Sequence, residues 1–317
     1  MDIGSLPLEV VASIFRDLPL RSQIRFASTC KAFKDVFDHE VRALHPSFHR
    51  KHQGVVQWML RNPVRMKLES LHGRWCFFGP CGWISSLERL QKVTMSYCRL
   101  TKVLLWKLPT SLRYVDLHRI VPSPGEHALH IVMFGLLPNL QELKLTVHPS
   151  WRMVTVGSLP PSLSLLHIRC ASKLVILDDS VRDVDCVHLH ARHALVCNSA
   201  FRGCTSLTLR CDNDAVPLEA CLPARGDRLY KLSVSSANGD QPIPSLAPFT
   251  NLKALTLCLD SVNLDQHHLN GMVGLETLHI EARFAWRYVS DGQNNNTLHF
   301  PPTCKSILVS ISHVRVI

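Results

Sequence analysis

From residue 90 onward, one short pattern of apolar and polar positions recurs along the chain. Each copy reads apolar-x-x-apolar-x-apolar, and the alternation at its end is typical of a short strand with one buried face. Ten copies occur, and they begin at Leu90, Leu112, Leu140, Leu163, Val184, Cys204, Leu229, Leu252, Leu275 and Cys304. Their starts lie between 20 residues (Val184 to Cys204) and 29 residues (Leu275 to Cys304) apart. The pattern therefore predicts stacked repeats that together form one parallel sheet.

Some segments depart from this even spacing. Residues 126–137 predict a helix inside one long interval, and residues 285–302, with Asp291-Gly292, predict a loop inside another. An earlier unit at Pro63, Met66 and Leu68 is interpreted as a degenerate first repeat. The last copy, in SILVSISHVRVI, has no polar capping unit, so we expect an open sheet edge there.

The repeat resembles the leucine-rich repeat, whose family pattern is Leu-x-x-Leu-x-Leu-x-x-Asn/Cys-x-Leu. The first copy fits this pattern through Cys98 and Leu100, whereas most later copies place other residue types, such as Asp212, at the Asn/Cys position. The resemblance implies an α/β fold in which residues 86–317 form a solenoid of about ten repeats with a parallel concave β-sheet.

The first fifty residues follow the period of amphipathic helices instead. Residues 8–18 place their apolar side chains on one helical face, Ser5 is the expected N-cap, and Pro19 predicts the end of the helix. A second amphipathic stretch follows, with Phe26, Cys30, Phe33 and Phe37 on one face. Three short helices in about 40 residues bury little by themselves. They therefore either dock on another chain or cap the repeats that follow.

The same residues resemble the F-box. The resemblance rests on Leu6-Pro7-Leu8-Glu9, Ile14-Phe15-Arg16-Asp17-Leu18 and Cys30-Lys31-Ala32-Phe33, although Thr29 stands where Val is usual and Phe33 where Trp is usual. It covers residues 1–45 and implies binding to the Skp adaptor of a Skp–cullin–F-box (SCF) ubiquitin ligase, and through it to cullin. By this resemblance the adaptor contact would be formed or supported by Leu6, Pro7, Ile14, Leu18, Ile24 and Phe33. Residues 46–85 would be a basic linker that contains the degenerate first repeat.

The alternate, outward-facing positions of the repeats are largely polar, and the central repeats concentrate basic side chains. This predicted target-binding patch consists of Lys144, His167, Arg169, His188, His190, Arg210 and Lys231. Such a patch favours an acidic or phosphorylated peptide. The alternative is a solvated basic face without a ligand.

Two further basic or metal-ligating clusters have competing interpretations. Cys186, His188, His190 and His193 could face one side of a strand, but neighbours on that side are about 7 Å apart, which strains coordination of one ion. We therefore expect no metal and no cofactor. Residues 42–74 carry seven Lys or Arg and one acid. They would contact nucleic acid or form a solvated linker helix, and the absence of an aromatic-basic stacking motif favours the linker.

Composition limits the class of protein. The 317 residues carry 35 Lys and Arg against 25 Asp and Glu, and 46% are hydrophobic, which is typical of a globular chain. We expect no signal peptide, no membrane segment and reduced thiols, hence an intracellular protein of the cytoplasm, the nucleus or both. No phosphate-loop, HExxH or GxSxG motif occurs, so we expect no enzyme.

Together the two resemblances predict a non-catalytic substrate receptor of an SCF ubiquitin ligase, with an N-terminal three-helix F-box followed by the repeat solenoid. Two rivals remain open. One is an F-box scaffold that works outside ubiquitin ligases, and the other is a basic repeat protein that binds nucleic acid.

Overall fold

The computed structural model describes residues 6–40, 43–44, 68–74, 84–100, 107–177, 181, 184–196, 201, 203–212, 222, 226–236, 246, 248–263, 272–287 and 302–316. The chain divides into two compact units. Unit 1 comprises Met1–Gly125 and Leu136–His148, and unit 2 comprises Glu126–Gly135 and Pro149–Ile317.

Three short helices open unit 1: α1 (Leu8–Asp17), α2 (Leu20–Ala27) and α3 (Lys31–Glu40). Two prolines set their starts, because Pro7 and Pro19 occupy the N-cap positions of α1 and α2 with φ of −55°, and neither makes a side-chain capping bond. The expected cap Ser5 lies outside the described residues. Val11, Phe15, Ala27 and Val36 are buried, and Phe26 stacks on Phe33 with ring centroids 3.9 Å apart. A small aromatic and aliphatic core therefore holds the helices together.

Parallel strands follow in unit 1. They are β1 (Ala43–Leu44), β2 (Ser70–Arg74), β3 (Lys92–Ser96), β5 (Tyr114–Pro122) and β7 (Glu142–Val147), with β4 (Arg99–Leu100) beside β5 and a 3₁₀ turn η4 (Ile84–Ser86) before β3. Leu71, Val93, Val115 and Leu143 are aligned across neighbouring strands, and each is at most 1% exposed.

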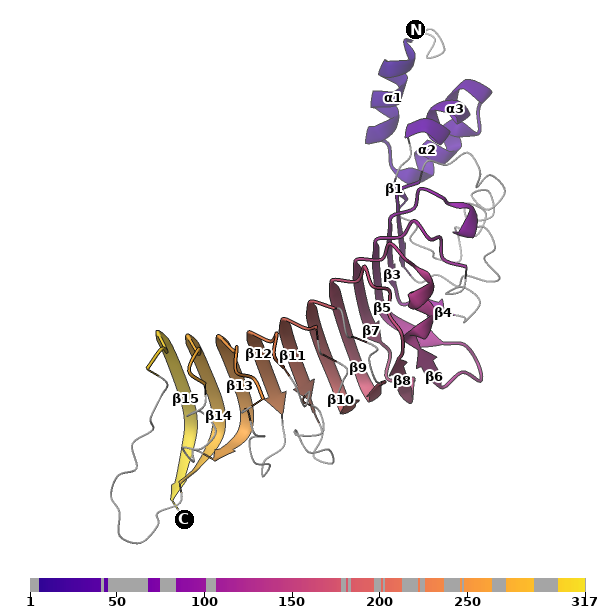
Figure 1. The fold of residues 1–317 in the computed structure, drawn as a ribbon. Helices are drawn as coiled ribbons and strands as arrows, with labels where there is room; N and C mark the ends of the chain where they lie inside the picture. Colours follow the sequence, from indigo (N-terminus) through magenta and orange to yellow (C-terminus); the bar gives the residue numbers. More distant parts are fainter. Residues whose placement is uncertain are drawn as a thin grey trace, which may run out of the picture. The chain divides into compact units, whose positions relative to one another are not determined.

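Unit 2 repeats this arrangement. Its strands are β6 (Ala128–His130), β8 (Met153–Val156), β9 (Leu165–Ile176), β10 (Cys186–Val196), β11 (Ser206–Cys211), β12 (Lys231–Ser236), β13 (Ala254–Asn263), β14 (Thr277–Arg287) and β15 (Ser306–Val316). From β9 to β15 each strand pairs in parallel with the next one in the sequence, and they lie side by side in Figure 1. β6 pairs with β8, and β8 pairs with the second half of β9.

The predicted period and register are confirmed. Leu166, Val187, Leu207, Leu232, Leu255 and Leu278 are aligned from β9 to β14 and are at most 1% exposed. The first apolar residue of each copy closes a turn before the strand, as Leu229 N–H donates to the Gly226 carbonyl and Leu252 N–H to the Phe249 carbonyl. Each buried Leu contributes roughly 1.5–3 kcal/mol through removal of its side chain from water, so stacked copies supply the core that one copy lacks.

The prediction of a helix over residues 126–137 is correct only for the second half of this segment. This segment forms β6 and a 3₁₀ helix, η5 (Ile131–Leu136), in which Ile131 and Phe134 are buried. A tight turn fits the space, because a Cβ on Gly135 would lie only 2.8 Å from the Ser158 carbonyl oxygen. The predicted loop over residues 285–302 begins three residues too early, because β14 continues to Arg287. Residues 288–301 lie outside the described residues.

The register corrects the degenerate first repeat. Ser70 is aligned with Lys92 and Leu71 with Val93, so Leu68 corresponds to Leu90, the first apolar position of a copy, and not to the last. Pro63 and Met66 lie outside the described residues. At the other end, β15 pairs only with β14 among the described strands, and Ile307, aligned with the core residue Leu278, is 42% exposed. This agrees with the expected open edge.

Candidate protein-interaction surfaces

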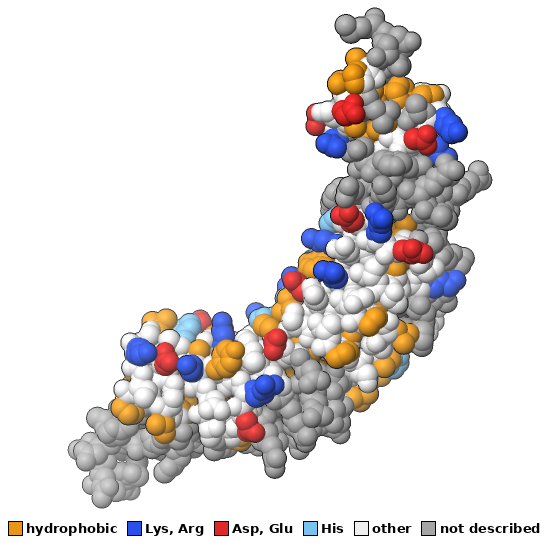
Figure 2. Space-filling view, turned by 45° about the horizontal axis from the view of Figure 1, so that its top comes forward, with side chains coloured by type: hydrophobic (Ala, Val, Ile, Leu, Met, Phe, Trp, Pro, Cys, Tyr) orange, Lys and Arg blue, Asp and Glu red, His pale blue; other side chains and the backbone are white. Residues whose placement is uncertain are grey.

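The helix α1 separates adjacent apolar residues onto opposite sides. Val11 and Phe15 are 3% and 1% exposed, whereas Val10 and Ile14 are 43% and 47% exposed. Apolar side chains are visible at the surface of the helical part in Figure 2. The interior of the helices is already filled by Phe15, so Val10 and Ile14 form an apolar surface that the described residues do not bury.

The six predicted adaptor-binding residues divide into two groups. Pro7 and Ile14 are exposed, whereas Leu6, Leu18, Ile24 and Phe33 are partly exposed. Phe33 stacks on Phe26, so it supports the helical core as well as reaching the surface. Gln23 Nε2 donates to the Phe15 carbonyl oxygen over 2.9 Å and ties α2 to the end of α1. The exposed Val10 was not in the predicted set, although its place on the apolar stripe of α1 was visible in the sequence.

In unit 2 the outward-facing side chains of the sheet form three rows that run across the strands. The strand register defines them as Leu165–Cys186–Ser206–Lys231–Ala254–Thr277, His167–His188–Thr208–Ser233–Thr256–His279 and Arg169–His190–Arg210–Ser235–Cys258–Glu281. Six of the seven predicted target-binding residues therefore lie on four neighbouring strands, β9 to β12. We call these six the basic face.

The remaining residue, Lys144, belongs to unit 1. Its Nζ lies 3.1 Å from Glu142 Oε2 and 5.1 Å from the ring centroid of Tyr114, which Lys92 approaches to 4.6 Å. Burial lowers the pKa of Lys144, but the contacts with Glu142 and Tyr114 outweigh it, so the pKa is raised. Burial, and then the Asp116 carboxylate, raise the pKa of Tyr114. Lys144 is thus engaged in a local cation–π and ion-pair cluster.

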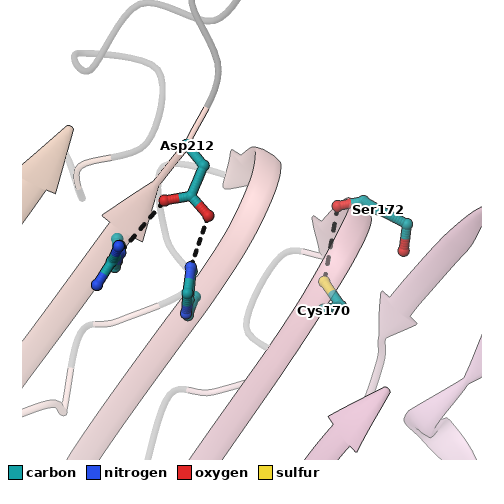
Figure 3. A network of polar contacts seen from close by, with 5 residues as sticks. Cys170, Ser172 and Asp212 are labelled. Carbon is teal, nitrogen blue, oxygen red and sulfur yellow. Dashed lines mark hydrogen bonds and ion pairs between the residues drawn. The ribbon is translucent and has the colours of Figure 1, made fainter. Parts of the chain in front are cut away.

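Asp212, whose carboxylate was not part of the predicted patch, contacts two residues of the third row. His190 Nε2 lies 2.7 Å from Asp212 Oδ2, and Arg210 Nε lies 3.2 Å from Asp212 Oδ1 (Figure 3). An ionised carboxylate only accepts, so Nε2 of His190 carries the hydrogen. Burial favours the neutral acid, but the hydrogen bonds from His190 and Arg210 and their charges outweigh it, so the pKa of Asp212 is lowered. The spacing Arg210-x-Asp212, with Asp212 directly after the strand that carries Arg210, was the available signal.

The second row brings imidazoles together. The rings of His167 and His188 have centroids 5.9 Å apart, and His188 Nε2 lies 3.2 Å from Cys186 Sγ. Burial, and then the charge of Lys231, lower the pKa of His188. Farther along the sheet, Cys258 Sγ donates to Glu281 Oε2 over 3.8 Å.

The structure bears on the metal-site hypothesis but not on the nucleic-acid hypothesis. Among the described residues, no group of three or more His, Cys, Asp or Glu side chains is arranged to hold a metal ion, and His190 forms its hydrogen bond with Asp212. The basic segment 42–74 lies mostly outside the described residues. In the described part of the chain, no helix has the length and apolar character needed to cross a bilayer.

Comparison with family models identifies the helical part of the chain. Residues 3–42 match the family model of the F-box domain. The chain therefore carries an F-box domain, and the strands that follow form a parallel-sheet solenoid. No curated protein sequence matches it.

The solved structures that match the chain are distant from it in sequence. An internalin from Listeria monocytogenes is 14% identical with a TM-score of 0.44, over 100% of this chain and 94% of that one. The circular leucine-rich-repeat protein CroV588 is 15% identical with a TM-score of 0.45, and the match spans 76% of this chain and 43% of that one. A leucine-rich-repeat protein of Leptospira interrogans is 13% identical with a TM-score of 0.36, and the match spans 86% of this chain and 90% of that one.

Proposed function

We propose that this protein is the substrate-recognition subunit of an SCF-type E3 ubiquitin ligase. Its F-box helices dock on a Skp-type adaptor, which connects them to cullin, and the sheet face of the solenoid binds a target protein. The observation that carries the proposal is the F-box match over residues 3–42, together with the exposed Val10 and Ile14 on α1. F-box and leucine-rich-repeat modules are generally non-catalytic interaction modules.

The mechanism proposed is tethering. Linking an adaptor-binding module to a target-binding module raises the concentration of target lysines near the conjugating enzyme without any bond-making by this chain. Ubiquitin transfer would belong to other subunits, and we assign this chain no catalytic role. Its site of action would be inside the cell, in the cytoplasm, the nucleus or both.

The target would be an acidic or phosphorylated segment. Support comes from the basic face, where Arg169, His188 and Lys231 stand on neighbouring strands with hydroxyl-bearing side chains such as Thr208 and Ser233 between them. Charged and hydroxyl donors on a flat sheet suit an anionic peptide better than an apolar one.

The adaptor contact is tested with tagged full-length chain in a eukaryotic lysate. An Ile14→Asp/Leu18→Asp variant places two carboxylates on an apolar surface, so we expect loss of the Skp-type adaptor and of cullin from the precipitate. Ser13→Asp is the matched control, because Ser13 is an exposed residue of the same helix, and it should retain both.

Each outcome bears on a different part of the proposal. Adaptor capture that survives in the Ile14→Asp/Leu18→Asp variant would overturn the assignment of the α1 surface. Capture of the adaptor by the unaltered chain without any cullin would favour the rival F-box scaffold outside ubiquitin ligases.

A further inference from the structure

The third row contributes three basic residues to the basic face, and the carboxylate of Asp212 contacts two of them. Arg169 on β9, His190 on β10 and Arg210 on β11 are aligned on adjacent strands. Neighbouring strands lie about 4.8 Å apart, so Arg169 and Arg210 flank His190 at a distance that their side chains span. Asp212 uses one oxygen for His190 and the other for Arg210. Within the described residues Arg169 forms no ion pair, so the row keeps an excess of positive charge.

The contacts that Asp212 makes with His190 and Arg210 are weak enough for another anion to replace its carboxylate. The side chains of Arg210 and Asp212 are 58% and 43% exposed, and exposed ion pairs are held weakly because water and salt screen them. Asp212 directly follows β11, which ends at Cys211. Among the described residues, a stronger anion from outside therefore has to displace only one partly solvated carboxylate from Arg210 and His190.

Resting on the function proposed above, we propose that Arg169, His190 and Arg210 form the binding site for a phosphorylated side chain of the target, and that Asp212 occupies this site until the phosphate displaces it. A phosphate monoester carries about −1.5 to −2 charges and three strong acceptor oxygens. It offers one oxygen to each of the three basic residues, whereas the carboxylate of Asp212 offers only two.

The surroundings favour the phosphate. On the next strand, Ser235 is aligned with Arg210, and its short side chain leaves room beside the guanidinium. The acid nearest along the row, Glu281, accepts a hydrogen bond from Cys258 and lies three strands from Arg210. Lys173 and His193 are aligned farther along β9 and β10 and add no negative charge.

The test uses the purified full-length chain and a fluorescent peptide of glycine and serine with one central phosphoserine. Fluorescence anisotropy at low salt measures its dissociation constant for the unaltered chain and for Asp212→Asn. Removing the competing carboxylate should tighten phosphopeptide binding about three- to tenfold. The control, Asp185→Asn, makes the same charge change at an exposed position just before β10 and should leave the constant unchanged.

Three results would overturn the inference. The first is that Asp212→Asn binds the phosphopeptide no more tightly than Asp185→Asn does. The second is that an Arg169→Gln/Arg210→Gln variant with an unchanged melting curve binds the phosphopeptide as well as the unaltered chain does. The third is that a peptide with glutamate in place of phosphoserine binds equally well. The same preparations are tested for adaptor capture. Absence of phosphopeptide binding in a chain that still captures the adaptor rejects this site and leaves the ubiquitin-ligase proposal standing.

Discussion

Gly226 lies in the turn before β12, and replacing it with alanine should destabilise unit 2. A Cβ at this position would collide with two ring carbons of Phe249. Phe249 is 1% exposed and its backbone N–H donates to the Leu246 carbonyl, so moving the ring aside would disturb a packed core residue. The glycine is therefore required for close packing of two successive repeats.

The magnitude follows from two opposing effects. Forcing an extra methyl into a packed core costs about 1–3 kcal/mol, whereas alanine gains about 0.4–1 kcal/mol because it restricts the unfolded chain. We expect Gly226→Ala to lower the free energy of unfolding by about 1–2 kcal/mol. For a folding unit of this size that corresponds to a melting temperature lower by roughly 2–8 °C, which circular dichroism measures directly.

Two further variants isolate the cause. Gly274, before β14, has its nearest neighbours at 3.8 Å (Leu252 O) and 3.9 Å (Thr250 O), so Gly274→Ala should be neutral or slightly stabilising. Phe249→Leu removes the ring carbons that collide, so the Gly226→Ala change should cost less in that background than in the unaltered chain. Equal melting temperatures for Gly226→Ala and Gly274→Ala would refute the packing argument.

Two other predictions follow from the ionisable groups. Burial raises the pKa of the Cys204 thiol to about 12. Iodoacetamide at neutral pH should therefore alkylate the exposed Cys30 and leave Cys204 unmodified until the chain unfolds, which mass spectrometry of the peptides measures. Equal alkylation rates of Cys30 and Cys204 in the folded chain would contradict the burial of Cys204. Burial and Lys231 lower the pKa of His188 below its usual 6.5, so the unfolded chain binds a proton on acidification before the folded chain does. Stability should therefore fall as the pH drops below about 6.5, and His188→Gln should flatten this dependence in urea titrations; an unchanged pH slope would count against it.

The register of the sheet was predictable because burial leaves a regular mark on the sequence. Leu207, Leu232 and Leu255 stand at the same place in successive copies, and a shift by one residue would turn each of them to solvent. The segment 126–137 was not predictable from periodicity. It is almost continuously apolar, yet Ile131 and Phe134 are buried while Val132 and Leu136 are exposed, and the tight turn depends on the distant Ser158 carbonyl.

The candidate sites were predictable in part for a similar reason. Alternation along β9 to β12 identified the basic residues that face outward, but it could not show which of them are neutralised. Asp212 stands beyond the strand pattern, at the position where the repeat family has Asn or Cys, and only the folded chain shows that it holds both His190 and Arg210. On α1, the F-box resemblance implied that Ile14 belongs to the adaptor contact, whereas the apolar stripe alone did not separate the exposed Val10 from the buried Val11.

The buried face of each strand stabilises the fold, whereas the outward face is the one that we propose binds the target. Val187, Leu207 and Leu232 are buried apolar residues that the stack requires, whereas their outward-facing neighbours His188, Thr208 and Ser233 differ from one strand to the next. Because exposed side chains contribute little to the free energy of folding, the outward rows can change in charge and size while the stack is kept. We therefore expect that residues such as Arg169 and Asp212, where we propose that the target binds, can be substituted one at a time without loss of the fold.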